Sequence, residues 1–94
     1  MEISTSGNTV TISGNIKSVS DYQTIKTSLD ALIRNSSIII NITDSISITS
    51  SVIGYFNKLV LKDKINIEMR IGNEQLMELL QDLNLASIFN ARKV

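Results

Sequence analysis

Alternating apolar and polar residues predict that the chain opens with a β-hairpin. Single Ile and Val residues alternate with Ser and Thr on both sides of Gly7-Asn8, a pair suited to positive φ in a tight turn. We therefore expect two antiparallel strands, at residues 2–5 and 9–13.

Three later segments carry apolar residues at the spacing of one helical face. The first begins at Ser20, which can form a capping box with Gln23, and runs to about Arg34. The second spans roughly residues 51–62, and the third follows a cap at Asn73. The three apolar stripes are Ile25, Leu29, Leu32 and Ile33; Ile53, Phe56, Val60 and Leu61; and Leu76, Leu79, Leu80 and Leu83.

Further strands are predicted between and after these helices. Residues 38–42 read Ile-Ile-Ile-Asn-Ile, which indicates a central strand buried on both faces, with helices on both sides of the sheet. Residues 65–71 alternate apolar with charged or amide side chains, which suits a strand nearer an edge. Residues 85–89 should form a packed turn through Leu85, Ile88 and Phe89, and residues 90–94 a last short strand.

The order of elements predicts an α/β fold with a mixed β-sheet flanked by helices. After the hairpin, helices join the strands, so these strands should be parallel with right-handed crossovers. The 94 residues, of which 43% are apolar, fit one compact domain at residues 1–94, with no repeat or linker.

Composition excludes several classes of function. Without Cys or His the chain lacks thiol nucleophiles, imidazole bases and most zinc sites, so we expect no catalytic residue, metal or cofactor and no enzyme. The formal charge is zero and basic runs are absent, which argues against nucleic acid as a partner. No apolar run approaches the roughly 20 residues that span a bilayer. We expect a cytoplasmic protein that does not insert into the membrane.

The segment at residues 39–59 carries a resemblance to a known family. A buried strand, an acidic turn and a short motif that opens an amphipathic helix resemble the STAS family of bacteria, named for sulfate transporters and anti-sigma factor antagonists. Leu85 and Phe89 are similar to the end of the family's closing helix. The family motif Asp-Ser-Ser-Gly-Leu-Gly stands here as Thr49-Ser50-Ser51-Val52-Ile53-Gly54.

The resemblance implies a phosphorylation site at Ser50. In antagonist-type members the serine after the Asp is phosphorylated by a partner serine kinase that is also the anti-sigma factor, and this controls binding. Thr49 and Val52 depart from the motif, where members have Asp and Gly. We expect Val52 to lie on the contact face.

Two functions and several structural alternatives stay open at this point. The first function is signal transduction by protein–protein interaction, as an anti-sigma factor antagonist-like module. The alternative is a constitutive STAS subunit of a lipid-trafficking type ABC transporter, which would contact the ATPase. Ser50 and Ser51 could serve only as helix caps, Asp44 only as a turn former, and Phe56 as core beside an exposed Tyr55. The residues expected to contact a partner are Asn15, Asp44, Thr49, Ser50, Ser51, Ile53 and Tyr55.

Overall fold

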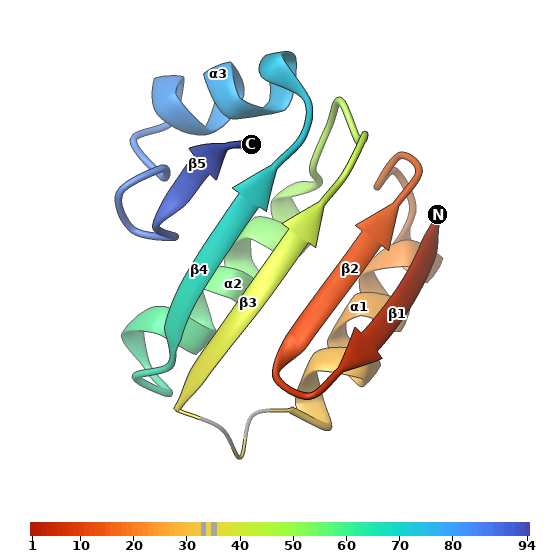
Figure 1. Ribbon diagram of the computed structural model, residues 1–94, viewed down its shortest axis with the longest axis vertical. Coiled ribbons are helices and arrows are strands. Elements are labelled where there is room, and N and C mark those ends of the chain that lie inside the picture. The colour runs from red at the N-terminus through yellow and green to blue at the C-terminus, as the bar shows by residue number, and fades with distance from the viewer. Residues whose placement is uncertain (33, 35) are drawn as a thin grey trace.

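The computed structural model describes residues 1–32, 34 and 36–94 and contains one five-stranded mixed sheet with three helices. Strands β1 and β2 form the predicted antiparallel hairpin, and β2, β3, β4 and β5 are parallel neighbours in that order (Figure 1). The α/β class and the element order are as predicted. The elements are β1 (Glu2–Ser6), β2 (Thr9–Ser13), α1 (Val19–Asp30), β3 (Ser37–Ile42), α2 (Ser50–Leu61), β4 (Asn66–Ile71), α3 (Glu74–Asp82) and β5 (Ala91–Lys93).

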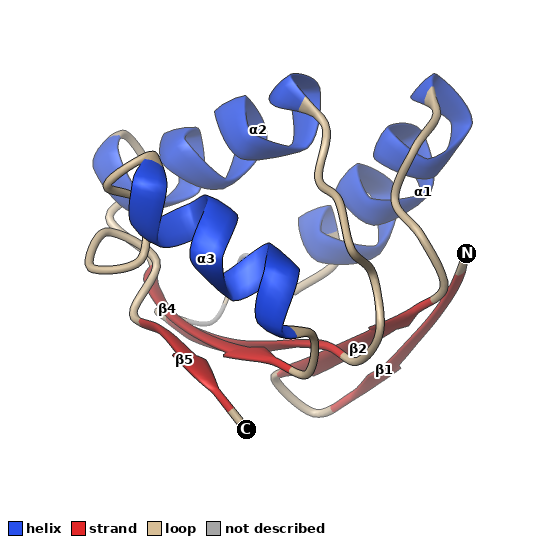
Figure 2. Ribbon diagram, turned by 90° about the horizontal axis from the view of Figure 1, so that it is seen from above, coloured by secondary structure: helices blue, strands red, loops and turns tan. Residues whose placement is uncertain are grey.

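All three helices lie on one face of the sheet, so the expectation of helices on both faces is wrong (Figure 2). The strand order advances in one direction from β2 to β5, and right-handed crossovers that advance in one direction place every helix on the same side. The β3 side chains on the other face, Ile39 and Asn41, are only half-buried. The two-sided burial predicted for this strand is therefore also wrong.

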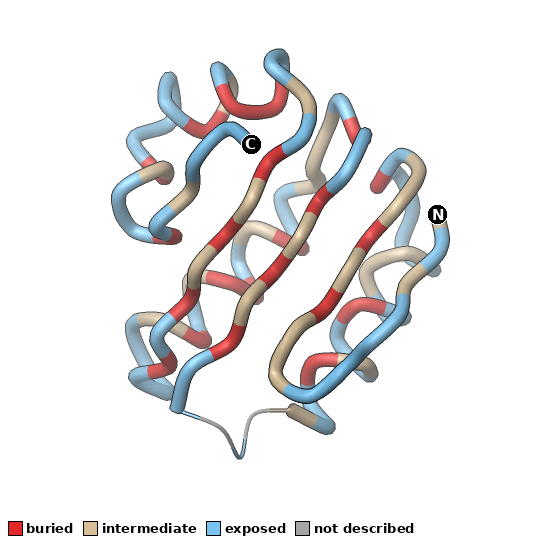
Figure 3. Tube along the Cα trace, viewed as in Figure 1, coloured by how far each residue is buried: buried red, intermediate tan, exposed pale blue. Residues whose placement is uncertain are grey.

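The core lies between the sheet and the helices. Buried residues alternate along β2, β3 and β4, because successive side chains of a strand point to opposite faces (Figure 3). Phe56 of α2 meets Phe89 edge to face, with ring centroids 5.8 Å apart. Phe89 and Leu85 thus form the predicted packed turn, whereas Ile88 is 37% exposed and lies outside it.

The first helix begins and ends earlier than predicted. Ser18, not Ser20, caps α1: its Oγ accepts from the Asp21 N–H at 3.0 Å, and the Asp21 carboxylate accepts from the Lys17 N–H at 3.0 Å. This reciprocal pair has the form of a capping box and holds the pKa of Asp21 below its usual range. The helix ends at Asp30, because Leu32 reaches its half-buried position through a turn. Ile33 lies outside the described residues.

The other predicted boundaries agree with the structure to within a residue or two. Asn73 caps α3 by accepting from the Leu76 N–H at 3.1 Å. β4 is second from the sheet edge, with only the short β5 beyond it. Gly72, just after β4, donates to the Ile42 carbonyl at 2.8 Å, and a Cβ there would lie 2.0 Å from the Thr43 oxygen. Only glycine fits this approach of two backbones.

Candidate functional site

Most of the residues expected to contact a partner gather at the edge of the sheet where the parallel strands end. The β2–α1 loop (residues 14–18) and the β3–α2 loop (residues 43–49) lie side by side there, next to the start of α2 (Figure 1). Binding residues are often found on loops that a rigid scaffold positions, and these loops follow two neighbouring strands, β2 and β3. This edge is therefore the first place to look for a site.

Two of the predicted site residues join these loops. The Gly14 N–H donates to Asp44 Oδ1 at 2.7 Å, and the Ile46 N–H donates to Asn15 Oδ1 at 3.1 Å. Asp44 therefore bonds to backbone 30 residues away, and the same oxygen also accepts from the neighbouring Thr43 hydroxyl at 3.2 Å. Both Asn15 and Asp44 are exposed, so each remains accessible from solvent while fixing the shape of the edge.

A buried serine that the sequence analysis missed ties the same two loops from below. Ser45 is fully buried; its Oγ accepts from the Ile16 N–H at 3.0 Å and donates to the Ser47 carbonyl at 2.6 Å. Ser47 Oγ donates to the Ile16 carbonyl at 3.1 Å. Nothing in the sequence marks Ser45, because the chain is rich in Ser and burial inside a loop leaves no periodic pattern. These hydrogen bonds connect the two loops to each other.

The cap of α2 comes from Thr49, which leaves the two serines exposed. Thr49 Oγ1 accepts from the Val52 N–H at 3.3 Å. Ser50 and Ser51 are the first two residues of the helix and both are exposed, so the alternative that their side chains serve only as caps is wrong. Thr is a favourable N-cap residue, so this hydrogen bond accounts for the start of α2.

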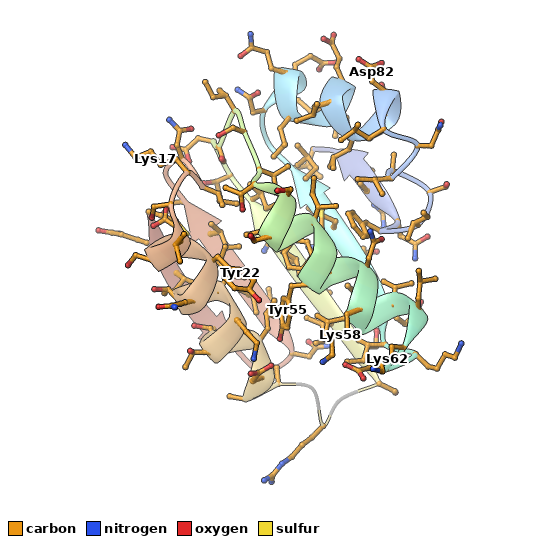
Figure 4. All side chains as sticks on the ribbon, turned by 180° about the vertical axis from the view of Figure 1, so that it is seen from behind. Lys17, Tyr22, Tyr55, Lys58, Lys62 and Asp82 are labelled. Carbon is orange, nitrogen blue, oxygen red and sulfur yellow. The ribbon has the colours of Figure 1, made fainter. Side chains whose placement is uncertain are left out.

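Two predictions about α2 are wrong because the helix packs on two sides. Val52 is fully buried, so it is not on a contact face. Tyr55 is 4% exposed and cannot be an exposed anchor. Its side chain lies between α2 and α1, next to Tyr22 (Figure 4). The two rings meet edge to face, with centroids 6.4 Å apart. Ile53 is half-buried, one turn beyond the helix start.

The Tyr55 hydroxyl instead fastens α2 to α1. It donates to Asp30 Oδ1 at 2.6 Å, and Lys26 forms an ion pair with the same carboxylate at 3.0 Å. This hydrogen bond, followed by the Lys26 contact, holds the pKa of Asp30 below its usual range, while burial raises the pKa of Tyr55. The cluster has a structural role and lies outside the edge.

An apolar residue at the tip of the β3–α2 loop completes the exposed surface. The Ile46 side chain is 51% exposed, while the Ile46 backbone N–H donates to Asn15 Oδ1. Between the starts of α1 and α2 lies a shallow depression of about 130 Å³, lined partly by Ser51 and Lys17. We refer to the following residues as the loop-edge surface: Asn15, Asp44, Ile46, Thr49, Ser50 and Ser51.

The polar side chains described at this edge carry hydroxyl, amide and carboxylate groups, together with the Lys17 ammonium group. Within residues 1–32, 34 and 36–94, no group of three or more Asp, Glu, His or Cys could hold a metal ion. In the same ranges, no helix has the length and apolar character needed to cross a membrane.

Comparisons with known proteins support the fold. No protein-family model matches the chain, and no curated protein matches it. The chain is similar to the NMR structure of the protein TM1081, with a TM-score of 0.66 over 98% of this chain and 79% of that one. The two sequences are 16% identical, so the likeness extends to the fold alone. It shows that this arrangement of hairpin, parallel strands and helices is one that another protein adopts.

Proposed function

We propose that the chain is a regulatory protein-binding module that resembles the antagonist type of STAS domain and binds its partner through the loop-edge surface. The observation that carries the proposal is the exposure of Ile46, Ser50 and Ser51 on loops held by side-chain hydrogen bonds. A surface that is ordered before binding loses little conformational entropy when a partner docks. In this role the chain itself carries out no catalytic step.

Phosphorylation of Ser50 by a partner serine kinase is the proposed switch. Ser50 is the first residue of α2, where backbone N–H groups and the positive end of the helix dipole accommodate a phosphate. The added charge of about −2 would therefore leave the fold intact and change the docking surface. The cytoplasm is the proposed location, because a serine kinase needs ATP.

A constitutive subunit of a lipid-trafficking type ABC transporter is the second proposal. The observation that favours it is Thr49, which caps α2 without supplying the carboxylate found beside the phosphorylated serine in the STAS motif. The other departure from the motif, Val52, does not favour either proposal, because its side chain is buried in the core. In this role the loop-edge surface would contact the transporter's ATPase without a switch.

A pull-down from the native host distinguishes these proposals. The baits are the wild type, Ser50→Ala, Ser50→Asp and Ser20→Asp, and mass spectrometry identifies both the partners and any phosphate on the baits. Ser20→Asp is the matched control, because it places the same charge in the exposed first turn of another helix, α1, outside the loop-edge surface. The switch predicts a kinase retained by the wild type, Ser50→Ala and Ser20→Asp and released by Ser50→Asp.

Other results reject the switch. If all four baits capture the same ATPase and Ser50 carries no phosphate, the constitutive subunit is the correct proposal. If Ser50→Asp and Ser20→Asp lose the partner equally, the effect is one of general charge, and Ser50 is not a specific phosphorylation site. Circular dichroism of each bait verifies that the fold is unchanged.

A further inference from the structure

Strand β1 forms one edge of the sheet and has β2 as its strand neighbour (Figure 1). Gly7 has φ of 59° at the first position of the two-residue turn, as a type II′ turn requires, and Ser6 faces Thr9 across it. The residues that flank such a turn form a hydrogen-bonded pair, and pairing alternates along the strand. The backbone groups of Ile3 and Thr5 therefore point outward, away from β2.

Apart from the charge of Glu2 at its start, this edge lacks the features that usually protect an edge strand. Natural proteins place Lys, Pro or a bulge on exposed edges to prevent further pairing. β1 reads Glu-Ile-Ser-Thr-Ser and pairs with β2 residue for residue, without a bulge. Four of its five residues are exposed, and Ile3 is half-buried against the core. Its outward N–H and C=O groups are thus open to another strand.

The helix beside β1 also offers an uncharged flank. α1 contacts β1, and its residues Tyr22 and Lys26 face α2. The opposite side of α1 carries a shallow depression of about 310 Å³ lined by small polar side chains without charge. The lining residues are Ser20, Gln23, Thr24, Thr27 and Ser28. A second molecule approaching this edge meets no row of like charges.

We infer that two copies of this chain pair through β1 in an antiparallel, two-fold symmetric manner. With Ser4 on the axis, Ile3 of each copy faces Thr5 of the other, and the outward backbone groups of both residues form four hydrogen bonds. Glu2 then faces Ser6, so no like charges meet. The β1 sequence therefore complements itself, which is why the occupant of this edge is a second copy.

The pairing would join all five strands of each copy into one continuous sheet. A two-fold axis perpendicular to the sheet keeps the helices of both copies on the same face, with the two α1 helices next to each other. It also turns the two loop-edge surfaces toward opposite ends of the dimer. Each copy could then bind its own partner, so this inference is independent of the proposed function.

Sedimentation equilibrium up to millimolar protein tests the inference. The wild type should self-associate. Thr5→Pro removes the outward N–H, which β1–β2 pairing does not use, and should weaken association at least about tenfold, since two of four hydrogen bonds are lost. Thr5→Val keeps the N–H and should associate like the wild type.

Ser4→Lys and Ser4→Glu should each be monomeric and associate with one another when mixed, because the two side chains face each other on the axis.

A wild type that stays monomeric throughout overturns the inference. Association of Thr5→Pro at wild-type strength also overturns it and places the interface elsewhere on the molecule. If circular dichroism shows that Thr5→Pro is unfolded, the Ser4 pair decides: failure of the mixed Ser4 variants to associate rejects pairing through β1.

Discussion

Two exposed regions of this molecule are polar in different ways. At the loop-edge surface, side chains such as Asn15 and Asp44 bond to backbone within the loops, and the exposed ends left over are Ile46 and the serine hydroxyls. On the open face of the sheet, charged side chains bond to one another: Glu68 forms ion pairs with Arg70 at 2.9 Å and with Arg92.

The difference shows which region is better suited to recognition. A partner on the open face would have to break or match the ion pairs of Glu68, and exposed pairs of this kind add little to affinity. A partner at the loop-edge surface covers an apolar side chain and leaves the internal hydrogen bonds intact. Exposure and polarity alone would not have separated the two regions.

The largest expected effect comes from the close backbone approach beneath the loop edge. Gly72→Ala places a Cβ 2.0 Å from the Thr43 oxygen, so a backbone segment must move, and the free energy of unfolding should fall by about 3 kcal/mol. Gly54→Ala is the control: its Cβ meets nothing within 4 Å on a helix, and it should raise stability by up to about 1 kcal/mol. Urea denaturation measures both, and equal stability of the two variants would contradict the packing described.

A smaller loss is expected from Ser45→Ala. Removing the hydroxyl leaves the Ile16 N–H and the Ser47 carbonyl without their buried partner, which should cost about 2 kcal/mol of unfolding free energy. The exposed control Ser50→Ala should change stability by less than about 0.5 kcal/mol. Hydrogen exchange provides a second measurement, with faster exchange expected at the Ile16 amide. No change there would mean that Ser45 does not hold the loops together.

Partner binding should distinguish the two regions directly. Ile46→Asp replaces an exposed apolar side chain by a charge, and the amount of partner captured should fall at least about tenfold. Arg92→Ala on the open face should leave capture unchanged. Thermal unfolding of both variants should match that of the wild type to within a few degrees. Loss of capture by Arg92→Ala alone would transfer the binding site to the open face.

The smallest effect concerns the charges of the open face. Hydrogen bonds from Arg92 and then Arg70 hold the pKa of Glu68 below its usual range. A lowered folded pKa stabilises the protein above the unfolded pKa, and this stabilisation is lost as pH falls through the folded pKa. The wild type should therefore exceed Glu68→Gln in stability at pH 7, with the difference shrinking below about pH 4. If the difference in unfolding free energy between the wild type and Glu68→Gln does not change with pH, the ion pairs of Glu68 contribute nothing to stability.

Sequence periodicity predicted the elements better than their arrangement in space. The hairpin, the three helices and the late strands follow from apolar spacing, which depends on local geometry. The placement of all helices on one face depends on the order of strands in the sheet. The local spacing of apolar residues does not reveal that order. Ser18 rather than Ser20 caps α1, because the Asp21 N–H donates to Ser18 and the Asp21 carboxylate accepts from the Lys17 N–H. The two serines are similar candidates in the sequence, and this pair of hydrogen bonds distinguishes them.

The candidate site was likewise predicted only in part, because the sequence pattern indicated local positions but not which side chains the packing buries. Motif resemblance placed Thr49, Ser50 and Ser51 at the start of a helix, and the structure places them there. It could not separate buried from exposed neighbours: Val52 and Tyr55 are buried because α2 packs against both the sheet and α1. Ser45 and Ile46 were missed because their roles depend on contacts between two loops, across 29 and 31 residues of sequence.

Site-specific photo-crosslinking in the native host tests the central claim most directly. A benzophenone side chain would replace Ile46 in one version of the chain and Arg92 in another, each with and without Ser50→Asp. We predict that a partner is crosslinked from position 46, that Ser50→Asp abolishes this crosslink, and that position 92 gives none. A partner crosslinked from position 92 and absent from position 46 would contradict the assignment of the binding site to the loop-edge surface.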